Sequence, residues 1–248
     1  MELLNHLVAD ADQETLVKLA MDGLRRTIVH YGHWFAQVEH QLGLEKALEL
    51  EQEVWDASAG TQLQRLGKTL GFPVRDGAPE ALHQLPRETL IELLKGLGVN
   101  WLANDGIWFQ AVERACGMND AKRCNDSCWT RYSPFEAART KALLGLPENG
   151  GLEALKKALA FRMYALVNRQ SIEDVDEHSF IFRMNACRVQ TARKRKGLED
   201  YACKSVGLVE YPYFARAIDP RITTECVGCP PDPHPEDWYC AWKFTLGE

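Results

Sequence analysis

The chain has 248 residues, of which 46% are hydrophobic and 26% charged, and its formal net charge is −6. This composition is that of a globular protein with enough apolar residues for one large or two modest domains. The acidic balance argues against a general nucleic-acid-binding protein, because such proteins carry a net basic surface.

The first part of the chain is expected to be helical. Apolar residues recur at intervals of three or four over 13–43, and a second helix or helix pair is expected between Leu48 and Leu70. A stretch rich in proline and glycine over 73–86 is typical of a linker, and a further helix is expected from Arg87 to about Leu102. We therefore expect a helical region over residues 1–103.

The second region, residues 104–248, mixes strands with helices. Short β-branched or aromatic runs predict strands, and apolar residues at helical spacing predict helices. The expected strands cover 107–112, 178–189, 221–227 and 238–246, and the expected helices cover 119–131, 134–144, 151–168 and 201–217. The last two strands should form a hairpin. The expected fold class is α+β, a helical N-terminal region followed by helices packed on an antiparallel sheet of about four strands.

The start of the sequence is acidic and has no basic flank or long apolar core of the kind found in signal peptides. The sequence also contains no apolar run of roughly 20 residues that could span a bilayer. We therefore expect a cytoplasmic protein without a membrane partner. Thiols stay reduced in that compartment, so the cysteines are expected to be metal ligands, nucleophiles or core residues rather than disulfides.

Five of the eight cysteines are crowded near the end of the sequence: Cys187, Cys203, Cys226, Cys229 and Cys240. Cys226 and Cys229 form a Cys-x2-Cys pair, and Cys240 returns after a proline-rich loop, which is a spacing suited to gripping one metal ion. We expect a metal site of Cys203, Cys226, Cys229 and Cys240, with Cys187 or His234 as other candidates for the fourth ligand. Zinc is the expected ion. An iron–sulfur cluster is the alternative, and a third possibility is that Cys240 merely packs with the tryptophans on its own face.

The segment from Cys187 to Lys204 contains six cations and two acids, a field that favours a thiolate and attracts a small anion. A solvated basic helix is the other interpretation. Arg188, beside Cys187 at a strand end, is the candidate for binding the substrate anion. Four nearby carboxylates are acid/base candidates, namely Glu210, Asp219, Glu225 and Asp232.

An aromatic pocket is a further hypothesis. Trp108, Phe109, Trp129 and Tyr132 could line it, and its polar groups could include Glu113 and Asn125. Core packing of these rings is the alternative. The sequence contains no glycine-rich nucleotide-binding motif and no serine-hydrolase motif, so those classes of enzyme are disfavoured.

Two stretches of the hairpin, Thr224–Cys229 and Tyr239–Phe244, resemble the terminal cysteine hairpin of 4-vinyl reductase domains. The wider segment from Cys187 to Phe244, with Ile107–Glu113, resembles an uncharacterised family of cytosolic proteins of anaerobic microbes related to the 2-aminothiazoline-4-carboxylate hydrolase-like proteins. The first resemblance implies helices packed on an antiparallel sheet, a small-molecule pocket between them and a metal-binding cysteine set in the hairpin. The second implies opening of a carbon–nitrogen bond in a small cyclic amino acid derivative.

The leading hypothesis is a small-molecule hydrolase that acts on a carbon–nitrogen bond of a compact anionic substrate. With a zinc ion that keeps an open position, the ion would activate water, Arg188 would hold the anion and Glu225 would move protons. If four cysteines close the site, the metal is structural and Cys187 becomes the candidate nucleophile. The alternative is a non-catalytic ligand-binding or sensor protein with a structural metal. The sequence leaves the oligomeric state open.

Overall fold

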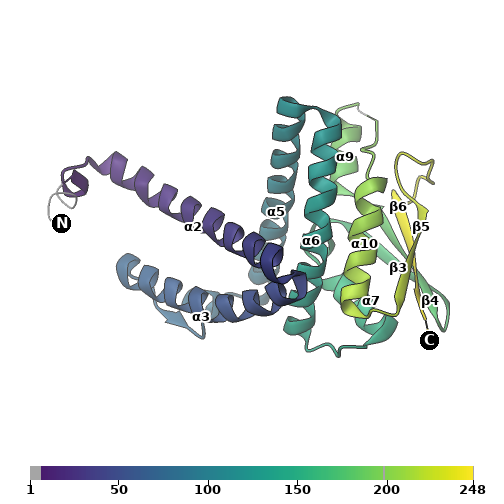
Figure 1. Cartoon of the computed structure of the whole chain (residues 1–248), viewed down its shortest axis with the longest axis horizontal. Helices are drawn as coiled ribbons and strands as arrows, with labels where there is room; N and C mark the ends of the chain where they lie inside the picture. The colour runs from purple at the N-terminus through teal and green to yellow at the C-terminus, as the bar shows by residue number, and fades with distance from the viewer. Residues whose placement is uncertain (1–6, 198, 248) are drawn as a thin grey trace. The chain divides into compact units, whose positions relative to one another are not determined.

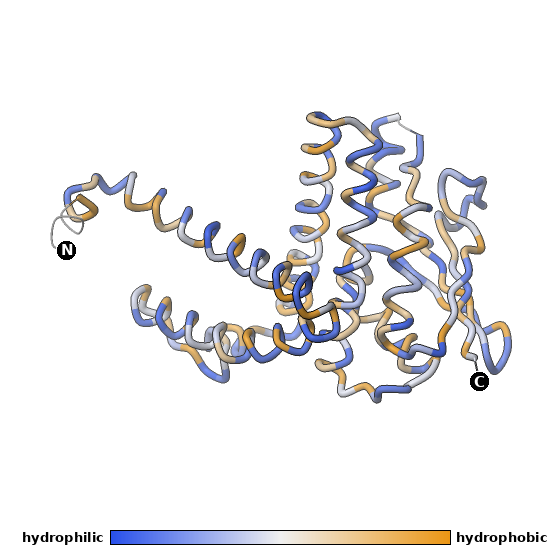
Figure 2. Tube along the Cα trace, viewed as in Figure 1, coloured by the Kyte–Doolittle hydropathy of each residue, from blue (hydrophilic) through white to orange (hydrophobic). Residues whose placement is uncertain are grey.

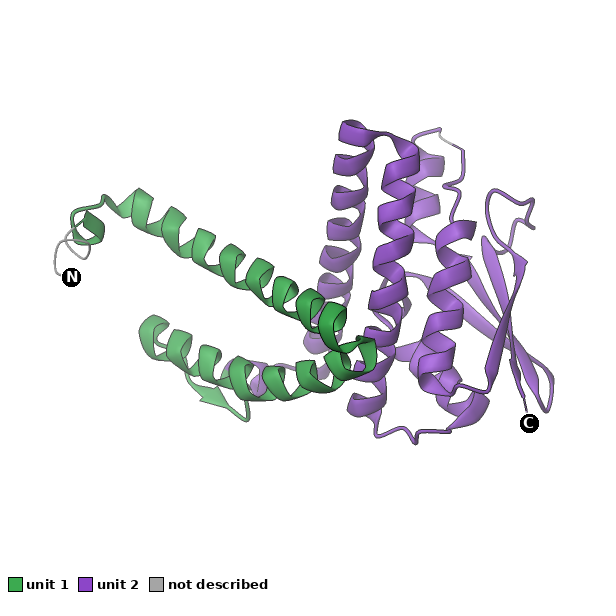
Figure 3. Ribbon diagram, in the orientation of Figure 1, with its two compact units in different colours: residues 1–80 green, residues 81–248 purple. Residues whose placement is uncertain are grey.

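The computed structural model describes residues 7–197 and 199–247, which form two compact units (Figure 1, Figure 3). Unit 1 ends at Glu80 and unit 2 begins at Ala81. This division falls in the stretch rich in proline and glycine, where a boundary between compact units is favoured. The boundary expected between residues 103 and 104 falls instead inside one long helix, α5 (Arg87–Cys116).

Unit 1 is a helical hairpin of α2 (Gln13–Leu42) and α3 (Leu44–Leu70), followed by a small antiparallel pair of β1 (Val74–Arg75) and β2 (Ala78–Pro79). The Asp12 side chain caps α2 by accepting a hydrogen bond of 2.9 Å from the backbone N–H of Thr15. Gly43 joins the two helices with φ of +88°, a conformation that side chains rarely adopt. The Tyr31 hydroxyl donates to Glu51 at 2.9 Å across the pair.

The packing within unit 1 is thin. Polar and apolar stretches alternate along α2 in Figure 2, and none of the residues of α2 is buried. In α3 only Ala47, Glu51 and Gly67 are buried. The main hydrophobic cluster of the described residues lies in unit 2. Within the same described ranges, no helix has the combined length and hydropathy of a membrane span.

Unit 2 contains helices and one four-stranded antiparallel sheet with strand order β3-β4-β6-β5. After the short α4 (Glu80–Gln84), which straddles the division between units, its helices are α5, α6 (Met118–Leu144), α7 (Gly151–Phe161), α8 (Met163–Val167), α9 (Arg188–Arg195) and α10 (Lys204–Ile218). Its strands are β3 (Arg169–Asp176), β4 (Ser179–Ala186), β5 (Ile222–Gly228) and β6 (Cys240–Leu246). The expected α+β fold class, with helices on an antiparallel sheet, is confirmed.

The core of unit 2 forms where α10 packs between the sheet and α6. The inward-facing residues of β4 and β6 include Phe182, Trp242 and Phe244, which are almost completely buried. Trp242 and Phe244 share one face of β6 because side chains alternate along a strand. Tyr211 of α10 stacks on Trp242 with a ring-centroid distance of 4.7 Å. This packing confirms the alternation predicted for the last strand.

One predicted strand was wrong, and one strand of the sheet was not predicted. Residues 107–112 belong to α5, and Trp108 on that helix is 68% exposed. The short apolar run resembles a strand because it has no distinct periodicity. Gly106, which suggested a turn before it, lies within the helix and faces open space. The strand that was missed is β3, whose mostly exposed sequence lacks a regular apolar pattern. Because β3 lies at the sheet edge and pairs only with β4, little burial marks it in the sequence.

The predicted break between helices at residues 131–134 was also wrong, because α6 runs continuously through Pro134. A proline removes one backbone donor from a helix and normally ends or kinks it. In this turn the Ser133 hydroxyl donates to the Trp129 carbonyl at 2.7 Å. Both Ser133 and Pro134 are buried, so tertiary packing outweighs the local preference for a helix start.

Gly207 provides the space that Trp242 occupies beneath α10. A Cβ atom at Gly207 would lie 2.4 Å from Cζ2 of Trp242, which is fully buried and has no room to move. Gly207→Ala is therefore expected to destabilise the protein by about 1–3 kcal/mol through overpacking. Urea unfolding would measure this, with Gly106→Ala as the control because its added Cβ meets no atom within 4 Å. Equal stability of the Gly207→Ala variant and the wild type would contradict this packing.

Asp219 ties α7 to the end of α10. Its fully buried carboxylate accepts from the backbone N–H of Gly151 at 2.9 Å and from the Arg221 guanidinium at 2.8 Å. The hydrogen bonds from Arg221, the largest influence, lower the pKa of Asp219 to about 2. Because the folded-state pKa is depressed, this stabilisation is present above pH ~4 and is lost as the pH falls toward ~2.

Asp219→Asn is expected to lower the free energy of unfolding by roughly 2 kcal/mol at neutral pH, since the amide cannot serve both donors equally. The difference between variant and wild type should shrink below pH ~4. Urea titrations at several pH values would test both points. A difference that stays constant down to pH ~2 would show that the charge of Asp219 is not responsible.

Candidate functional site

A cavity of about 750 Å³ lies in unit 2. Its walls come from the helices α5, α6, α8, α9 and α10, from the strands β4 and β6, and from the residues that begin and end the loop between β5 and β6. This volume lies in the range of about 300–1,000 Å³ that is usual for small-molecule sites. The fold thus places a small-molecule-sized cavity between the helices and the sheet.

One wall of this cavity is formed by cysteines. Cys187, Cys203, Cys229 and Cys240 all line it, although they come from distant points of the chain. Cys226 does not line the cavity but packs against the same core from β5. We call these five residues the cysteine cluster. Cys240 is its central member, because it lies close enough to interact electrostatically with each of the other four.

Backbone pairing explains why the cluster forms. In the sheet, Cys240 is opposite Met184, which places the start of β6 near the end of β4 and therefore near Cys187. A bulge after Cys226 shifts the register of β5, and Cys229 follows it directly. The Lys204 N–H donates to the Pro230 carbonyl at 2.9 Å and so joins the residue after Cys203 to the residue after Cys229.

Gln190 fixes Cys203 at the start of α10. This buried amide donates to Sγ of Cys203 at 3.1 Å and to the Tyr201 carbonyl at 2.9 Å. Its own oxygen accepts from the Tyr201 N–H at 2.8 Å. An N–H donor directed at sulfur stabilises negative charge there. The sulfur of Cys203 therefore has a donor already in place for the charged form that binds metals.

The surroundings of Cys187, Cys203 and Cys229 disfavour their thiolate forms and raise their pKa values. Burial raises the pKa of Cys187 to about 11, and burial also raises the pKa of Cys203 well above its usual value. A side-chain hydrogen bond with Cys240, followed by burial, raises the pKa of Cys229. The expected lowering of thiol pKa by the basic segment was wrong, because burial outweighs the cations of α9. Neutral thiols are poor nucleophiles, whereas a metal ion can displace their protons.

No three His, Cys, Asp or Glu side chains of residues 7–197 and 199–247 stand in an arrangement that could hold a metal ion. The donor chemistry of the cluster nevertheless suits a soft metal, since its members are all thiols. The three remaining cysteines, Cys116, Cys124 and Cys128, are exposed and belong to other parts of α5 and α6.

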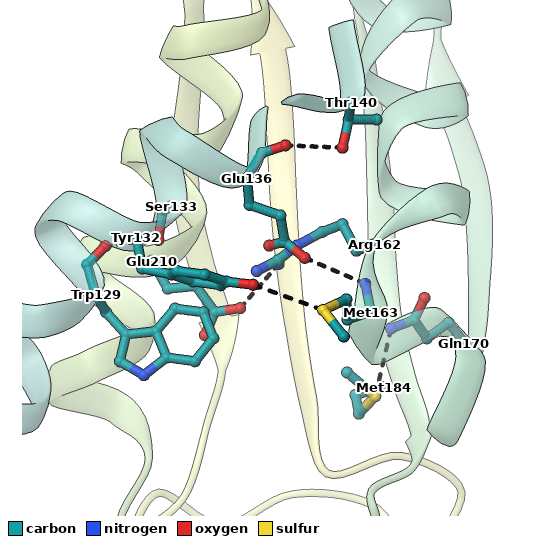
Figure 4. Close-up of polar contacts among 10 residues, drawn as sticks. All are labelled: Trp129, Tyr132, Ser133, Glu136, Thr140, Arg162, Met163, Gln170, Met184 and Glu210. Atoms are coloured by element: carbon teal, nitrogen blue, oxygen red, sulfur yellow. Dashed lines mark hydrogen bonds and ion pairs between the residues drawn. The ribbon is translucent and has the colours of Figure 1, made fainter. Parts of the chain in front are cut away.

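A buried ion-pair network adjoins the cavity. In Figure 4 the Arg162 side chain lies between Glu136 of α6 and Glu210 of α10. Its Nε donates to Glu136 at 2.7 Å, and its Nη1 lies 2.8 Å from Glu210. Glu210 lines the cavity, and burial raises its pKa to about 7. A carboxyl group with that pKa can accept or donate a proton near neutral pH.

Aromatic rings form much of the remaining wall. Trp129 and Tyr164 stack with a centroid distance of 5.5 Å and an interplanar angle of 11°, and both line the cavity. Phe109 and Tyr201 meet edge to face at 5.3 Å at another part of the lining. Asp105 is also part of the lining, and its pKa is raised by burial. A planar or apolar ligand group would find favourable surfaces here.

The sequence matches a family of unknown function (DUF6125) over residues 9–85 and 82–246. The chain belongs to this family. Comparison with curated proteins and with solved structures finds no match.

In this DUF6125 protein, most of the residues singled out from the sequence meet at one cavity. The lining includes Cys187, Arg188, Glu113 and Asn125 together with three of the four expected metal ligands, Cys203, Cys229 and Cys240. Asn125 donates to Asp105 at 3.4 Å. Arg188 is exposed and is joined at the lining by Arg193 and Lys196, so α9 and the residue that follows it give this part of the cavity a positive charge.

Other predicted residues of the DUF6125 chain lie elsewhere. Trp108 points to solvent and does not line the cavity. Glu225 lies at an exposed position of β5 opposite Lys243, also outside the lining. His234 pairs with Asp200 at 2.9 Å, and Asp232 pairs with Lys204 at 2.6 Å. His234, a candidate metal ligand, and Asp232, an acid/base candidate, are therefore both engaged in ion pairs.

Arg162 and Glu136 are not among the site residues predicted from the sequence of this DUF6125 protein. Arg162 is a single charge between the apolar residues Phe161 and Met163, and Glu136 lies two residues after the buried Pro134. A lone charge inside an otherwise apolar segment is the signal that could have identified Arg162, because such a charge needs a buried partner. Which carboxylates would partner it depends on how α6 and α10 pack.

Proposed function

We propose that the protein binds a metal ion through its cysteine cluster and is a hydrolase acting on a carbon–nitrogen bond of a compact anionic substrate. The single observation that carries this proposal is that four cysteines from distant points of the chain line one cavity with Glu210. Thiols supply the ligands, and the carboxyl group supplies the means of proton transfer. The resemblance to 2-aminothiazoline-4-carboxylate hydrolase-like proteins supports the carbon–nitrogen bond as the target.

Zinc is the proposed ion, with Cys203, Cys229 and Cys240 as its first three ligands. These three lie at the joined ends of α10 and the hairpin, and Cys187 or Cys226 would be the fourth ligand if the site is closed. Bound zinc with an open position supplies a Lewis acid. An iron–sulfur cluster held by the same cysteines is the alternative outcome of metal analysis. A reduced cytoplasmic environment is part of the proposal because it keeps the thiols available.

Glu210 is the proposed proton-transfer group, in place of Glu225. Glu210 is buried, lines the cavity and has a pKa raised to about 7 by burial, whereas Glu225 is exposed on β5. A general acid or base works best when its pKa lies near the operating pH. Glu210→Gln is therefore expected to lower turnover by about 10²–10⁴-fold with little effect on metal content.

The cations of α9 are the proposed site for the anionic group of the substrate. Arg188, Arg193 and Lys196 line the cavity at its positively charged side. The backbone N–H of Arg188 donates to the Asn168 side chain at 2.8 Å and so fixes the start of α9. This bond does not involve the Arg188 guanidinium. Aromatic rings on the opposing helices α5 and α6 would contact the uncharged part of the substrate.

A non-catalytic ligand-binding or sensor protein is the second candidate. The observation that favours it is the aromatic lining, to which Trp129, Tyr164, Tyr211 and Trp242 contribute. In that case the metal would stabilise the hairpin. The resemblance to 4-vinyl reductase domains, which implies a small-molecule pocket with a cysteine-bound metal, supports this candidate as well as the first.

The test begins with protein purified without oxygen or chelators, followed by metal analysis and incubation with 2-aminothiazoline-4-carboxylate. Loss of the compound, followed by chromatography and mass spectrometry, would support the hydrolase if Glu210→Gln slows it and the exposed-site control Cys116→Ser does not. Binding of the compound without turnover would favour the sensor. Absence of metal from the purified protein would refute both metal-dependent proposals.

A further inference from the structure

The ion-pair network beside the cavity has an imbalance of charge. Arg162 is 2% exposed, and the side chains of its two carboxylate partners, Glu136 and Glu210, are each 7% exposed. One guanidinium thus faces two carboxyl groups in the protein interior. If both acids were ionised, one negative charge would remain uncompensated away from water, which is unfavourable.

Arg162 is the cation that pairs with Glu210. In the described part of the chain, the other titratable groups that interact electrostatically with Glu210 include the acids Asp105 on α5, Tyr164 on α8, Tyr211 on α10, Cys187 and Cys203. The remaining neighbours of the Arg162 guanidinium are aromatic, with Phe214 at 4.5 Å from the ring centroid. These groups can stabilise Arg162, but they cannot neutralise an additional carboxylate.

The two glutamates are not equivalent partners of Arg162. Glu136 uses both of its oxygens, one for Nε of Arg162 at 2.7 Å and the other for the Met163 N–H at 3.1 Å. Among the described residues, Glu210 is bound by the ion pair to Nη1 at 2.8 Å, and it lines the cavity while Glu136 does not. The better-bonded carboxylate holds the guanidinium more firmly.

We propose that Glu136 is a positioning residue. Because Glu136 binds the Arg162 guanidinium, Glu210 is left able to hold an exchangeable proton at the cavity wall. This inference rests on the proposed function, because it assigns how the proton-transfer group of the same cavity is prepared. The raised pKa of Glu210 is consistent with it, since burial is the first cause and the charge of Glu136 adds to it. Glu136 itself would not contact a ligand in the cavity.

Infrared difference titration of the purified protein tests this inference directly. The carboxylic acid band that disappears in Glu210→Gln is assigned to Glu210 and followed through neutral pH. The expected midpoint in the wild type is about 7. Glu136→Gln removes a like charge and frees Arg162 to serve Glu210, so the midpoint should fall by about 1–3 pH units. The control is Glu153→Gln, which alters an exposed glutamate on α7 and should leave the midpoint unchanged.

An unchanged midpoint in Glu136→Gln, or a Glu210 that is ionised throughout the range in the wild type, would overturn the inference. If Glu136→Gln does not fold, Glu136→Asp is measured instead, because the shorter acid cannot reach both Arg162 and Met163; a lowered midpoint supports the inference and an unchanged one overturns it. The infrared readout needs neither metal nor turnover. A shift without hydrolysis would therefore refute only the proposed function, and hydrolysis without a shift would refute only this inference.

Discussion

Cys229→Ser is expected to lose bound metal and to destabilise unit 2 by several kcal/mol, because structural zinc sites contribute on the order of 10 kcal/mol to folding. Cys229 is 1% exposed and follows the bulge of β5 beside Cys240. A serine hydroxyl cannot replace a thiolate as a zinc ligand, and it is more costly to bury. Metal-to-protein ratio by plasma mass spectrometry and thermal unfolding would measure the two effects.

The control for this experiment is Cys116→Ser, which changes an exposed cysteine at the end of α5 and should alter neither quantity. A chelator added to the wild type should lower its melting temperature toward that of Cys229→Ser, and it should leave the Cys229→Ser protein unaffected. If the variant retains a full complement of metal, Cys229 is not a ligand. If wild type and variant respond equally to chelator, the stability difference arises from packing alone.

Arg162→Met is expected to destabilise the protein by about 3–5 kcal/mol at neutral pH, because it strands the buried carboxylates of Glu136 and Glu210 without a cation. Methionine fills similar space, so the loss reports on charge more than on volume. Urea unfolding would measure it. Arg216→Met is the matched control, since Arg216 is exposed on α10 and such surface changes usually stay within about 0.5 kcal/mol.

The cost of Arg162→Met should depend on pH in a defined direction. In the variant, no cation offsets the burial of Glu210, so the pKa of Glu210 rises further above its value in the unfolded chain. The folded state then binds more protons than the unfolded state, so the stability of the variant rises as the pH falls from neutral toward ~4. The triple variant Arg162→Met, Glu136→Gln, Glu210→Gln should recover stability at neutral pH. A cost that is independent of pH would show that the carboxylates are not its source.

Much of the fold could be predicted from local patterns in the sequence. The alternation along Trp238–Leu246 marked the last strand, and the stretch of prolines and glycines over 73–86 marked the place where the two units divide. The pattern failed where tertiary packing outweighs local preference. Pro134 lies within a helix because its surroundings bury it, and β3 is a polar edge strand that its pairing with β4 holds in place.

The gathering of the cysteines could be predicted from the sequence, but the surroundings of the candidate site could not. The spacing of Cys226, Cys229 and Cys240 pointed to a shared site, and the hairpin brings them to one core. The sequence could not show which carboxylate lies at the cavity. Glu210 is buried on α10 and Glu225 lies on β5, and this difference depends on how the helix and the strand pack. The neutral state of Cys187 was also beyond the sequence, since it depends on burial rather than on the neighbouring cations.

X-ray absorption at the metal edge of protein purified without oxygen or chelators tests the cysteine cluster most directly. The predicted spectrum has a shell of three or four sulfur ligands, at about 2.3 Å if the ion is zinc. Cys229→Ser and Cys240→Ser should each remove sulfur from that shell, whereas Cys116→Ser should not. A protein without metal, or a metal surrounded only by oxygen and nitrogen, would contradict the assignment of this cluster as a metal site.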